Sequence, residues 1–201
     1  MKILTIGIIA LNVILSFYCF NNKKAFENLC FSPYAIAKDR SQWFRFISHG
    51  FIHADIGHLA FNMITLYFFG SNIEGNIMDG PEYLLFYLSA IVFATLPTYQ
   101  KQKENPSYKA VGASGAVSSI LFVLVLYAPW SKIYLHFFIP IYFVIFAVFY
   151  IIYSSYQSKK AKDNVAHDVH LWGALYGIAY MLILHPESFR IFLDGILDPP
   201  F

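Results

Sequence analysis

Val111-Gly112-Ala113-Ser114-Gly115-Ala116-Val117-Ser118 is a run of small residues that begins where a polar, lysine-bearing loop meets an apolar segment. Small residues let two membrane helices approach closely, so such a run taken alone more often indicates tight helix packing than chemistry. The run also contains one candidate nucleophile, Ser114, at the start of the apolar segment. Its meaning therefore depends on whether the chain is a membrane protein and whether a base lies near Ser114.

The composition of the chain is that of a membrane protein. Of its 201 residues, 58% are hydrophobic and 13% are charged, whereas soluble domains carry about 25% charged residues. The net charge of +2, without a basic run interleaved with aromatics, argues against nucleic acid as a partner. The two cysteines, Cys19 and Cys30, do not make a disulfide framework. We expect an integral, multi-pass membrane protein, in the inner membrane if the source is bacterial.

Six segments are apolar enough to suggest membrane spans, each of which needs about 20 mostly apolar residues. They are approximately Ile3–Phe20, Ile56–Asn72, Tyr83–Thr98, Gly115–Trp130, Ile133–Tyr156 and Val169–Leu184. The first lacks a small-x-small cleavage pattern at its end, so we interpret it as a retained span rather than a signal peptide. The connection 21–55 mixes aromatic and charged residues, which is typical of a membrane interface. The sequence predicts an all-α, six-helix membrane bundle forming one domain over residues 1–201, with no added soluble domain.

The order of the spans places several polar side chains near one membrane face. Because successive spans alternate in direction, the second, fourth and sixth spans begin on the same face. Their starts carry His58 with Asn62, Ser114, and His170, respectively. Polar groups at membrane depth are costly and usually turn toward the interior of a bundle. These four side chains are therefore expected to lie close to one another.

These residue types suit a serine nucleophile. A serine hydroxyl needs a base to take its proton, and His170 can act as that base. Gly112 and Gly115 leave room for a substrate carbonyl, and N–H groups at a helix start can stabilise an oxyanion. His58 and Asn62, four residues apart, share a helix face and can both donate hydrogen bonds to that oxyanion. As alternatives, His170 could bind only a neighbouring carbonyl, and His58 and Asn62 could only join helices.

The sixth span carries small residues on the face of His170. Gly173 and Gly177 lie three and seven residues after His170, which would let this span approach another helix closely. The fourth span offers Ser114 and Ser118 as the matching small face.

Other polar residues give alternative interpretations of the site. Asp168 lies two residues from His170 and so does not share its helix face, which favours a dyad over a triad. His167 is a rival base, and His53 is expected to form a hydrogen bond within its loop. A zinc site is disfavoured because no His-Glu-x-x-His helix is present and His53 to His58 is not a standard ligand step. No metal or cofactor is therefore expected.

A transporter or channel is the alternative that needs no catalysis. Polar residues within membrane spans also mark the paths of transported solutes. Here they cluster on one side instead of crossing the depth of the bilayer, which favours a localised site.

Taken in order, the motifs resemble the rhomboid family of intramembrane serine proteases. The matching elements are Trp43-Phe44-Arg45, His53–Asn62, Gly70–Glu74, Gly112-Ala113-Ser114-Gly115, and His170-Leu171-Trp172-Gly173 with Gly177. Each motif alone is weak, but five of them in the right order and on the right spans are specific.

The resemblance implies a role for each matching residue. Ser114 would be the nucleophile and His170 the general base, while His58 and Asn62 would help the Ser114 N–H to hold the oxyanion. Structural support would come from Arg45, Glu74, Gly112, Gly115, Gly173 and Gly177. The substrate would be a transmembrane protein in the lipid bilayer, cleaved near the membrane surface, and the fifth span with Pro140 would match the lateral gate proposed for the family.

The resemblance leaves four questions open. The family often has an aromatic residue four positions after the serine, beneath the histidine, whereas this chain has Ser118. Lysine and arginine favour cytoplasmic loops and here lie mostly on the side of Ser114, whereas the family usually has its active site outside. A catalytically silent rhomboid-like protein that binds membrane clients is the alternative function, although the presence of both Ser114 and His170 argues against it. The oligomeric state also stays open.

Overall fold

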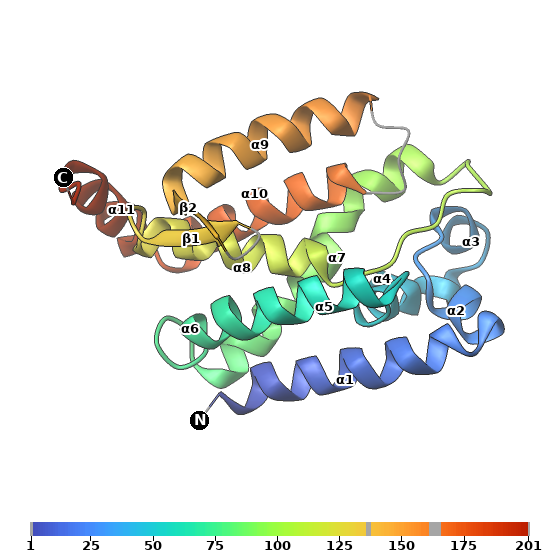
Figure 1. Ribbon diagram of the computed structural model, residues 1–201. Coiled ribbons are helices and arrows are strands. Elements are labelled where there is room, and N and C mark those ends of the chain that lie inside the picture. The colour runs from blue at the N-terminus through green and yellow to red at the C-terminus, as the bar shows by residue number, and fades with distance from the viewer. Residues whose placement is uncertain (1, 136–137, 161–165, 201) are drawn as a thin grey trace.

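The computed structural model describes residues 2–135, 138–160 and 166–200. Long helices lie side by side and make up most of the fold (Figure 1). They are α1 (Ile3–Phe20), α5 (Ile56–Thr65), α7 (Gly80–Gln102), α8 (Ser114–Tyr127), α9 (Phe143–Lys160) and α10 (His167–Leu184). A π-helical segment, Leu66–Gly70, continues α5 into the short α6 (Ser71–Ile73).

Helix α8 is the centre of the bundle. Every residue from Gly115 to Leu126 is buried, as expected for a helix that is hydrophobic all round. α8 packs against α7, α9 and α10, and also against the π-helical extension of α5. α1 lies beyond α5 on the other side (Figure 1). The small-residue run Val111–Ser118 thus leads into a helix that is enclosed by protein over most of its length.

Helix α1 has the predicted bounds, Ile3–Phe20, and this prediction is confirmed. Its buried face includes the polar residues Thr5, Asn12 and Ser16. Its start is capped by Glu74, whose carboxylate accepts hydrogen bonds from Leu4 N at 3.0 Å and Thr5 N at 2.8 Å. The first N–H groups of a helix have no partner within the helix, so this remote carboxylate joins the start of α1 to the end of the second predicted span.

The number of long apolar helices is smaller than the number of predicted spans. Among the described residues, α1 and α7 are long and apolar enough to cross a membrane. A third span results if α10 and α11 (Glu187–Leu197), which are bent by 112°, are taken as one. α8 and the apolar part of α9, Phe143–Ser158, are shorter. The apolar helices agree with a membrane protein.

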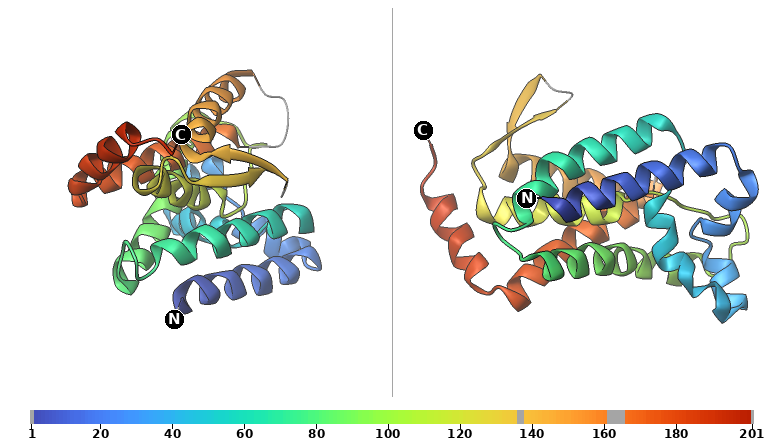
Figure 2. Two further views of the ribbon diagram at one scale, coloured as in Figure 1. Left: turned by 60° about the vertical axis from the view of Figure 1, so that its left-hand side comes forward. Right: turned by 90° about the horizontal axis from the view of Figure 1, so that it is seen from below.

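The predicted span Ile133–Tyr156 does not begin as a helix, and this part of the prediction is wrong. Strand β1 (Lys132–Leu135) pairs antiparallel with β2 (Ile139–Tyr142), with Tyr134 opposite Pro140, and α9 begins only at Phe143. Figure 2 shows this hairpin projecting from the bundle. Pro140 lacks the N–H that a helix interior requires, and the isoleucines around it favour a strand. Pro140 is therefore a strand residue and not a helix kink.

The connection 21–55 forms a series of short helices. They are α2 (Lys23–Leu29), α3 (Pro33–Lys38), η1 (Arg40–Phe44), α4 (Arg45–Ser48) and η2 (His49–Phe51). Phe31 exchanges two backbone hydrogen bonds with Ala110, at 2.9 and 3.1 Å. This bridge fastens the connection to the loop that leads into α8.

His185 joins helix ends at the end of α10 that is remote from His170. Its Nε2 lies 2.5 Å from Glu82 Oε1 in the first turn of α7, and its Nδ1 lies 3.3 Å from Glu187 Oε1. The hydrogen bond with Glu82 is the largest of the causes that raise the pKa of His185 above its ordinary value of 6.5. The folded state therefore favours the charged imidazole.

The stability of the protein is expected to depend on pH through His185. Because the folded state raises this pKa, the stabilisation is fully present below pH 6.5 and is lost as the pH rises through the raised pKa. The melting temperature in detergent should fall over that range, and the fall should be smaller in His185→Gln. Equal pH dependence of the two melting temperatures would contradict this expectation.

Candidate active site

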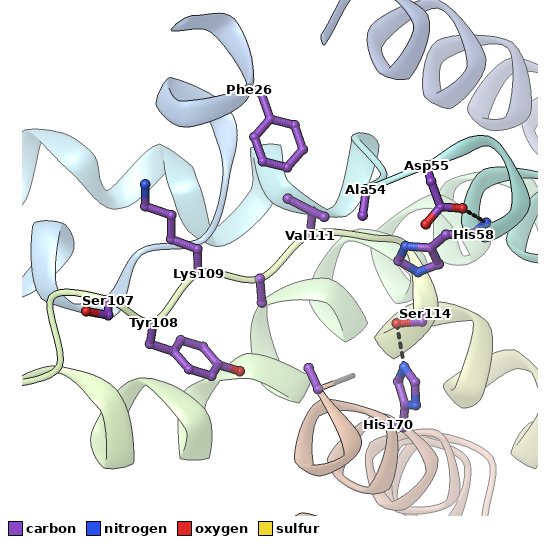
Figure 3. A pocket seen from close by; sticks show the side chains of 12 residues that line it. Phe26, Ala54, Asp55, His58, Ser107, Tyr108, Lys109, Val111, Ser114 and His170 are labelled. Carbon is purple, nitrogen blue, oxygen red and sulfur yellow. Dashed lines mark hydrogen bonds between the residues drawn. The ribbon is translucent and has the colours of Figure 1, made fainter. Parts of the chain in front are cut away.

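Ser114 and His170 meet at the first turns of α8 and α10. His170 Nε2 lies 2.7 Å from Ser114 Oγ, although the two residues are 56 positions apart in the chain (Figure 3). A base within hydrogen-bond reach of a serine hydroxyl is the geometry that nucleophilic catalysis requires. The two residues that the sequence predicts as nucleophile and base are therefore brought together.

The close approach of α8 and α10 depends on glycine. A Cβ atom at Gly173 would lie 2.2 Å from the carbonyl oxygen of Gly115, and one at Gly177 would lie 2.4 Å from that of Ser119. Ser119 Oγ also donates to Gly173 O at 2.7 Å. The two backbones are so close that only the hydrogen atoms of the glycines fit between them. This close packing brings Ser114 within reach of His170.

The prediction that Ser114 and Ser118 form the face opposite these glycines is wrong. The matching positions are Gly115 and Ser119, one residue further along α8. Successive residues of a helix are about 100° apart, so a shift of one residue turns a pair of positions toward a different neighbour. Ser118 faces α9 instead, where its Oγ lies 2.5 Å from the hydroxyl of Tyr150.

Gly112 brings the backbone before Ser114 against the ring of His58. Its φ is +120°, a conformation that favours glycine. A Cβ atom at this position would lie 2.6 Å from His58 Cε1. The imidazole of His58 lies close to Ser114 in the same cavity (Figure 3). A donor is thus present beside the hydroxyl that would attack a carbonyl.

The structure does not bring Asn62 to the same place. Its side chain is buried, and Nδ2 donates to the carbonyl of His58, one turn earlier in α5, at 2.9 Å. Among the described residues, those that line the cavity do not include Asn62. Of the two predicted oxyanion donors, only His58 faces Ser114.

A cavity of about 700 Å³ opens beside the serine and histidine. It runs from Ser114 along the loop before α8 toward Phe26 in the first connection (Figure 3). Its lining consists of Phe26, Ala54, Asp55, His58, Ser107, Tyr108, Lys109, Ala110, Val111, Ser114, Ala166 and His170. Ligand sites commonly have volumes of about 300–1,000 Å³, so the cavity has the size of a ligand site.

His53 has a larger part in the site than the sequence predicts. Its ring is buried, its Nδ1 lies 3.1 Å from Ser16 Oγ in α1, and its Nε2 accepts from Ala113 N at 3.4 Å. Burial, with a smaller contribution from His58, lowers the pKa of His53 to about 3. The ring is therefore neutral and can accept the Ala113 hydrogen bond. His53 thus links Ala113, the residue before Ser114, to Ser16 of α1. Its hydrogen bonds therefore reach beyond the loop within which the sequence places them.

Arg45 and Glu74 lie away from the cavity and bind backbone groups. Arg45 is 8% exposed, and its Nη1 donates to the carbonyls of Glu27 at 2.8 Å and Cys30 at 2.9 Å. These bonds hold the first connection together, whereas Glu74 caps α1.

The rival residues near His170 make other contacts. Asp168 accepts a hydrogen bond from Thr98 Oγ1 of α7 at 2.8 Å. The ring of His167 packs edge-on against those of His170 and Tyr153, with centroids 6.2 and 5.6 Å away. Within the described part of the chain, no three His, Cys, Asp or Glu side chains cluster so as to hold a metal ion.

The comparisons with known proteins agree on one family. A family model described as "Rhomboid domain" matches residues 40–187. The chain is 33% identical over 144 residues to "RHOMBOID-like protein 12, mitochondrial" of Arabidopsis thaliana, covering 64% of this chain and 42% of that protein. It is 28% identical over 145 residues to human "Presenilin-associated rhomboid-like protein, mitochondrial", covering 67% and 36%. It is also 30% identical over 84 residues to "Putative rhomboid protease YdcA" of Bacillus subtilis, covering 42% and 41%. The matches thus span 36–42% of the length of these relatives.

Proposed function

Because this chain belongs to the rhomboid family, we propose that it is an intramembrane serine endopeptidase that cleaves transmembrane protein substrates near the membrane surface. The observation that carries the proposal is the 2.7 Å contact of His170 Nε2 with Ser114 Oγ in the wall of a cavity. Family membership alone does not decide the activity, since the relatives are named both as rhomboid-like proteins and as rhomboid proteases.

The first half of the proposed reaction forms an acyl-enzyme. His170 takes the proton of the Ser114 hydroxyl as the oxygen attacks the scissile carbonyl carbon. The resulting oxyanion accepts hydrogen bonds from the Ser114 N–H at the start of α8 and from the imidazole of His58. Breaking of the C–N bond releases the amine, which takes its proton from His170. Asn62 supports this arrangement by holding the carbonyl of His58.

The second half returns the enzyme to its starting state. His170 takes a proton from a water molecule, whose oxygen attacks the acyl carbon. The tetrahedral intermediate then collapses, the ester bond to Ser114 Oγ breaks, and His170 returns the proton to that oxygen. Water must reach Ser114 for this step, and the cavity beside it offers the path.

We propose that the bundle crosses the membrane six times. The spans would be α1, α5 with its π-helical extension, α7, α8, α9 and α10. Short helices are acceptable at the centre because α8 is enclosed by protein rather than lipid. The Arabidopsis and human relatives are named as mitochondrial, and these names lend no support to the expected bacterial inner membrane. We therefore propose an integral membrane protein and name no compartment for it.

A catalytically silent protein that binds membrane clients is the second candidate function. It is favoured by the names of the Arabidopsis and human relatives, which call them rhomboid-like and do not include the word protease. In that case the cavity would hold a client segment without attack by Ser114.

A fluorophosphonate probe distinguishes these functions, because it reacts only with an activated serine. The purified protein in detergent is expected to be labelled, and Ser114→Ala is expected to lose the label. Ser158→Ala is a matched control and should be labelled normally, since the described hydrogen bond of the Ser158 hydroxyl goes to Ser155 O within α9. Client binding without labelling of Ser114 would favour the silent protein.

A further inference from the structure

A pair of hydroxyl groups, one of them on a buried serine, lies one helical turn beneath the proposed nucleophile. Ser118 Oγ of α8 and the Tyr150 hydroxyl of α9 are 2.5 Å apart. Ser118 is 3% exposed. A hydroxyl group in such surroundings needs a partner, and these two groups satisfy each other across the α8–α9 interface.

Tyr150 is held rigidly against the helix that carries Ser114. Its ring packs against Phe122 of α8 and Phe146 of α9, with centroid distances of 5.5 and 5.4 Å. Ser114, Ser118 and Phe122 follow one another at steps of four and so form one stripe along α8. Tyr150 therefore contacts the second and third residues of the stripe that Ser114 begins.

The pairing keeps Ser118 from bonding to the nucleophile's own backbone. Serine within a helix readily donates to the carbonyl four residues earlier, and such bonds bend helices. The adjacent Ser119 does this, donating to Gly115 O at 3.0 Å. For Ser118 the corresponding carbonyl is that of Ser114. With Ser118 Oγ turned toward Tyr150, the described contacts include no bond from Ser118 to the Ser114 carbonyl, and we infer that Tyr150 holds the hydroxyl in this direction.

We propose that Tyr150 is a positioning residue for Ser114 and His170, acting through the hydroxyl of Ser118. The inference rests on the proposed function, because it assigns a role in orienting an attacking serine. α9 then contributes to catalysis although none of its residues lines the cavity among those that the structure describes. Loss of the Tyr150 hydroxyl lets Ser118 turn to the Ser114 carbonyl, which tilts the first turn and moves Ser114 Oγ relative to His170 Nε2.

The test measures the reactivity of Ser114 and the steady-state kinetics of the full chain in detergent. Tyr150→Phe is expected to lower the rate constant of fluorophosphonate labelling, and kcat for a transmembrane substrate, by about three- to tenfold. KM should not change, because neither Tyr150 nor Ser118 touches the cavity. Ser118→Ala has no hydroxyl group that could bond the Ser114 carbonyl, so its labelling rate should stay close to that of the wild type. The double variant should regain the rate that Tyr150→Phe loses, because the second substitution removes the hydroxyl that would tilt the first turn.

Tyr176→Phe is the matched control. The Tyr176 hydroxyl donates to Ser89 Oγ at 2.6 Å and joins α10 to α7 instead of α8 to α9. It should lower the melting temperature as Tyr150→Phe does, yet leave the labelling rate unchanged. If Tyr150→Phe and Tyr176→Phe slowed labelling equally, the effect would come from a general loss of helix packing, and the inference would be overturned. Labelling of Tyr150→Phe at the wild-type rate would also overturn it while leaving the protease proposal intact. Absence of labelling in the wild-type protein would overturn both.

Discussion

Replacing Ser114 with alanine is expected to lower the turnover of a transmembrane substrate by at least about 10⁴-fold. The proposed reaction passes through an ester at Ser114 Oγ. Among the described hydrogen bonds, no other hydroxyl group in the lining of the cavity contacts a histidine nitrogen. His170→Ala should cause a loss of similar size, because the hydroxyl is a poor nucleophile without a base. The double variant should be no worse than either single one, since the two residues act as a unit.

The measurement is cleavage of a model transmembrane substrate in liposomes, followed by gel electrophoresis. Melting temperatures of the variants establish that they remain folded. His167→Gln is the matched control because it removes the rival imidazole from the same helix, and it should keep activity within about tenfold of the wild type. Full activity of Ser114→Ala or His170→Ala would refute the proposed reaction, and inactivity of His167→Gln alone would transfer the role of base to His167.

Replacing Gly173 with alanine is expected to have the largest effect on stability. The new Cβ would lie 2.2 Å from the oxygen and 2.9 Å from the carbonyl carbon of Gly115. These are backbone atoms, so no side chain can rotate away, and α8 and α10 must separate. We expect a loss of about 3 kcal/mol or more in the free energy of unfolding, together with loss of labelling at Ser114.

Gly7→Ala is the matched control for this change. A Cβ atom at Gly7 in α1 meets nothing within 4 Å, so the stability should change by no more than about 1 kcal/mol, in the direction that favours alanine in a helix. Unfolding in detergent, followed by circular dichroism, compares the two variants. A Gly173→Ala protein as stable as Gly7→Ala would mean that the contact between α8 and α10 is looser than the structure describes.

The sequence predicts the contacts between residues more accurately than it predicts the rotation of each helix about its own axis. Alternation of spans is enough to bring Ser114 and His170 to one end of the bundle, and the contact follows. Spacing fixes the face of α10 that carries Gly173, but the partner face on α8 depends on the rotation of that helix. A rotation of about 100° decides between Ser118 and Ser119, and hydrophobicity does not distinguish the two faces of a helix that is buried all round.

Other differences have equally specific causes. A short apolar run is ambiguous between strand and helix. The hydrophobicity of the segment around Pro140 predicts a helix, whereas its proline and isoleucines favour a strand. The bond of His53 to Ser16 joins residues 37 positions apart, so no local pattern reveals it. Tyr150 lies 32 positions from Ser118. The residue beneath the nucleophile can thus come from another helix, where a search at fixed spacing does not find it.

The length of α8 sets the depth at which a peptide bond would be cut. Its 14 residues rise about 21 Å, whereas the hydrocarbon layer of a bilayer is about 30 Å thick. In the proposed six-span arrangement, with the far end of α8 at the opposite membrane surface, the shortfall of about 9 Å would leave Ser114 in a recess below the level of the lipid headgroups. A substrate helix that stays straight and hydrogen-bonded along the bundle surface would not place its carbonyl carbon in that recess. The proposed protease would therefore be expected to select segments that lose their helical hydrogen bonds at low cost.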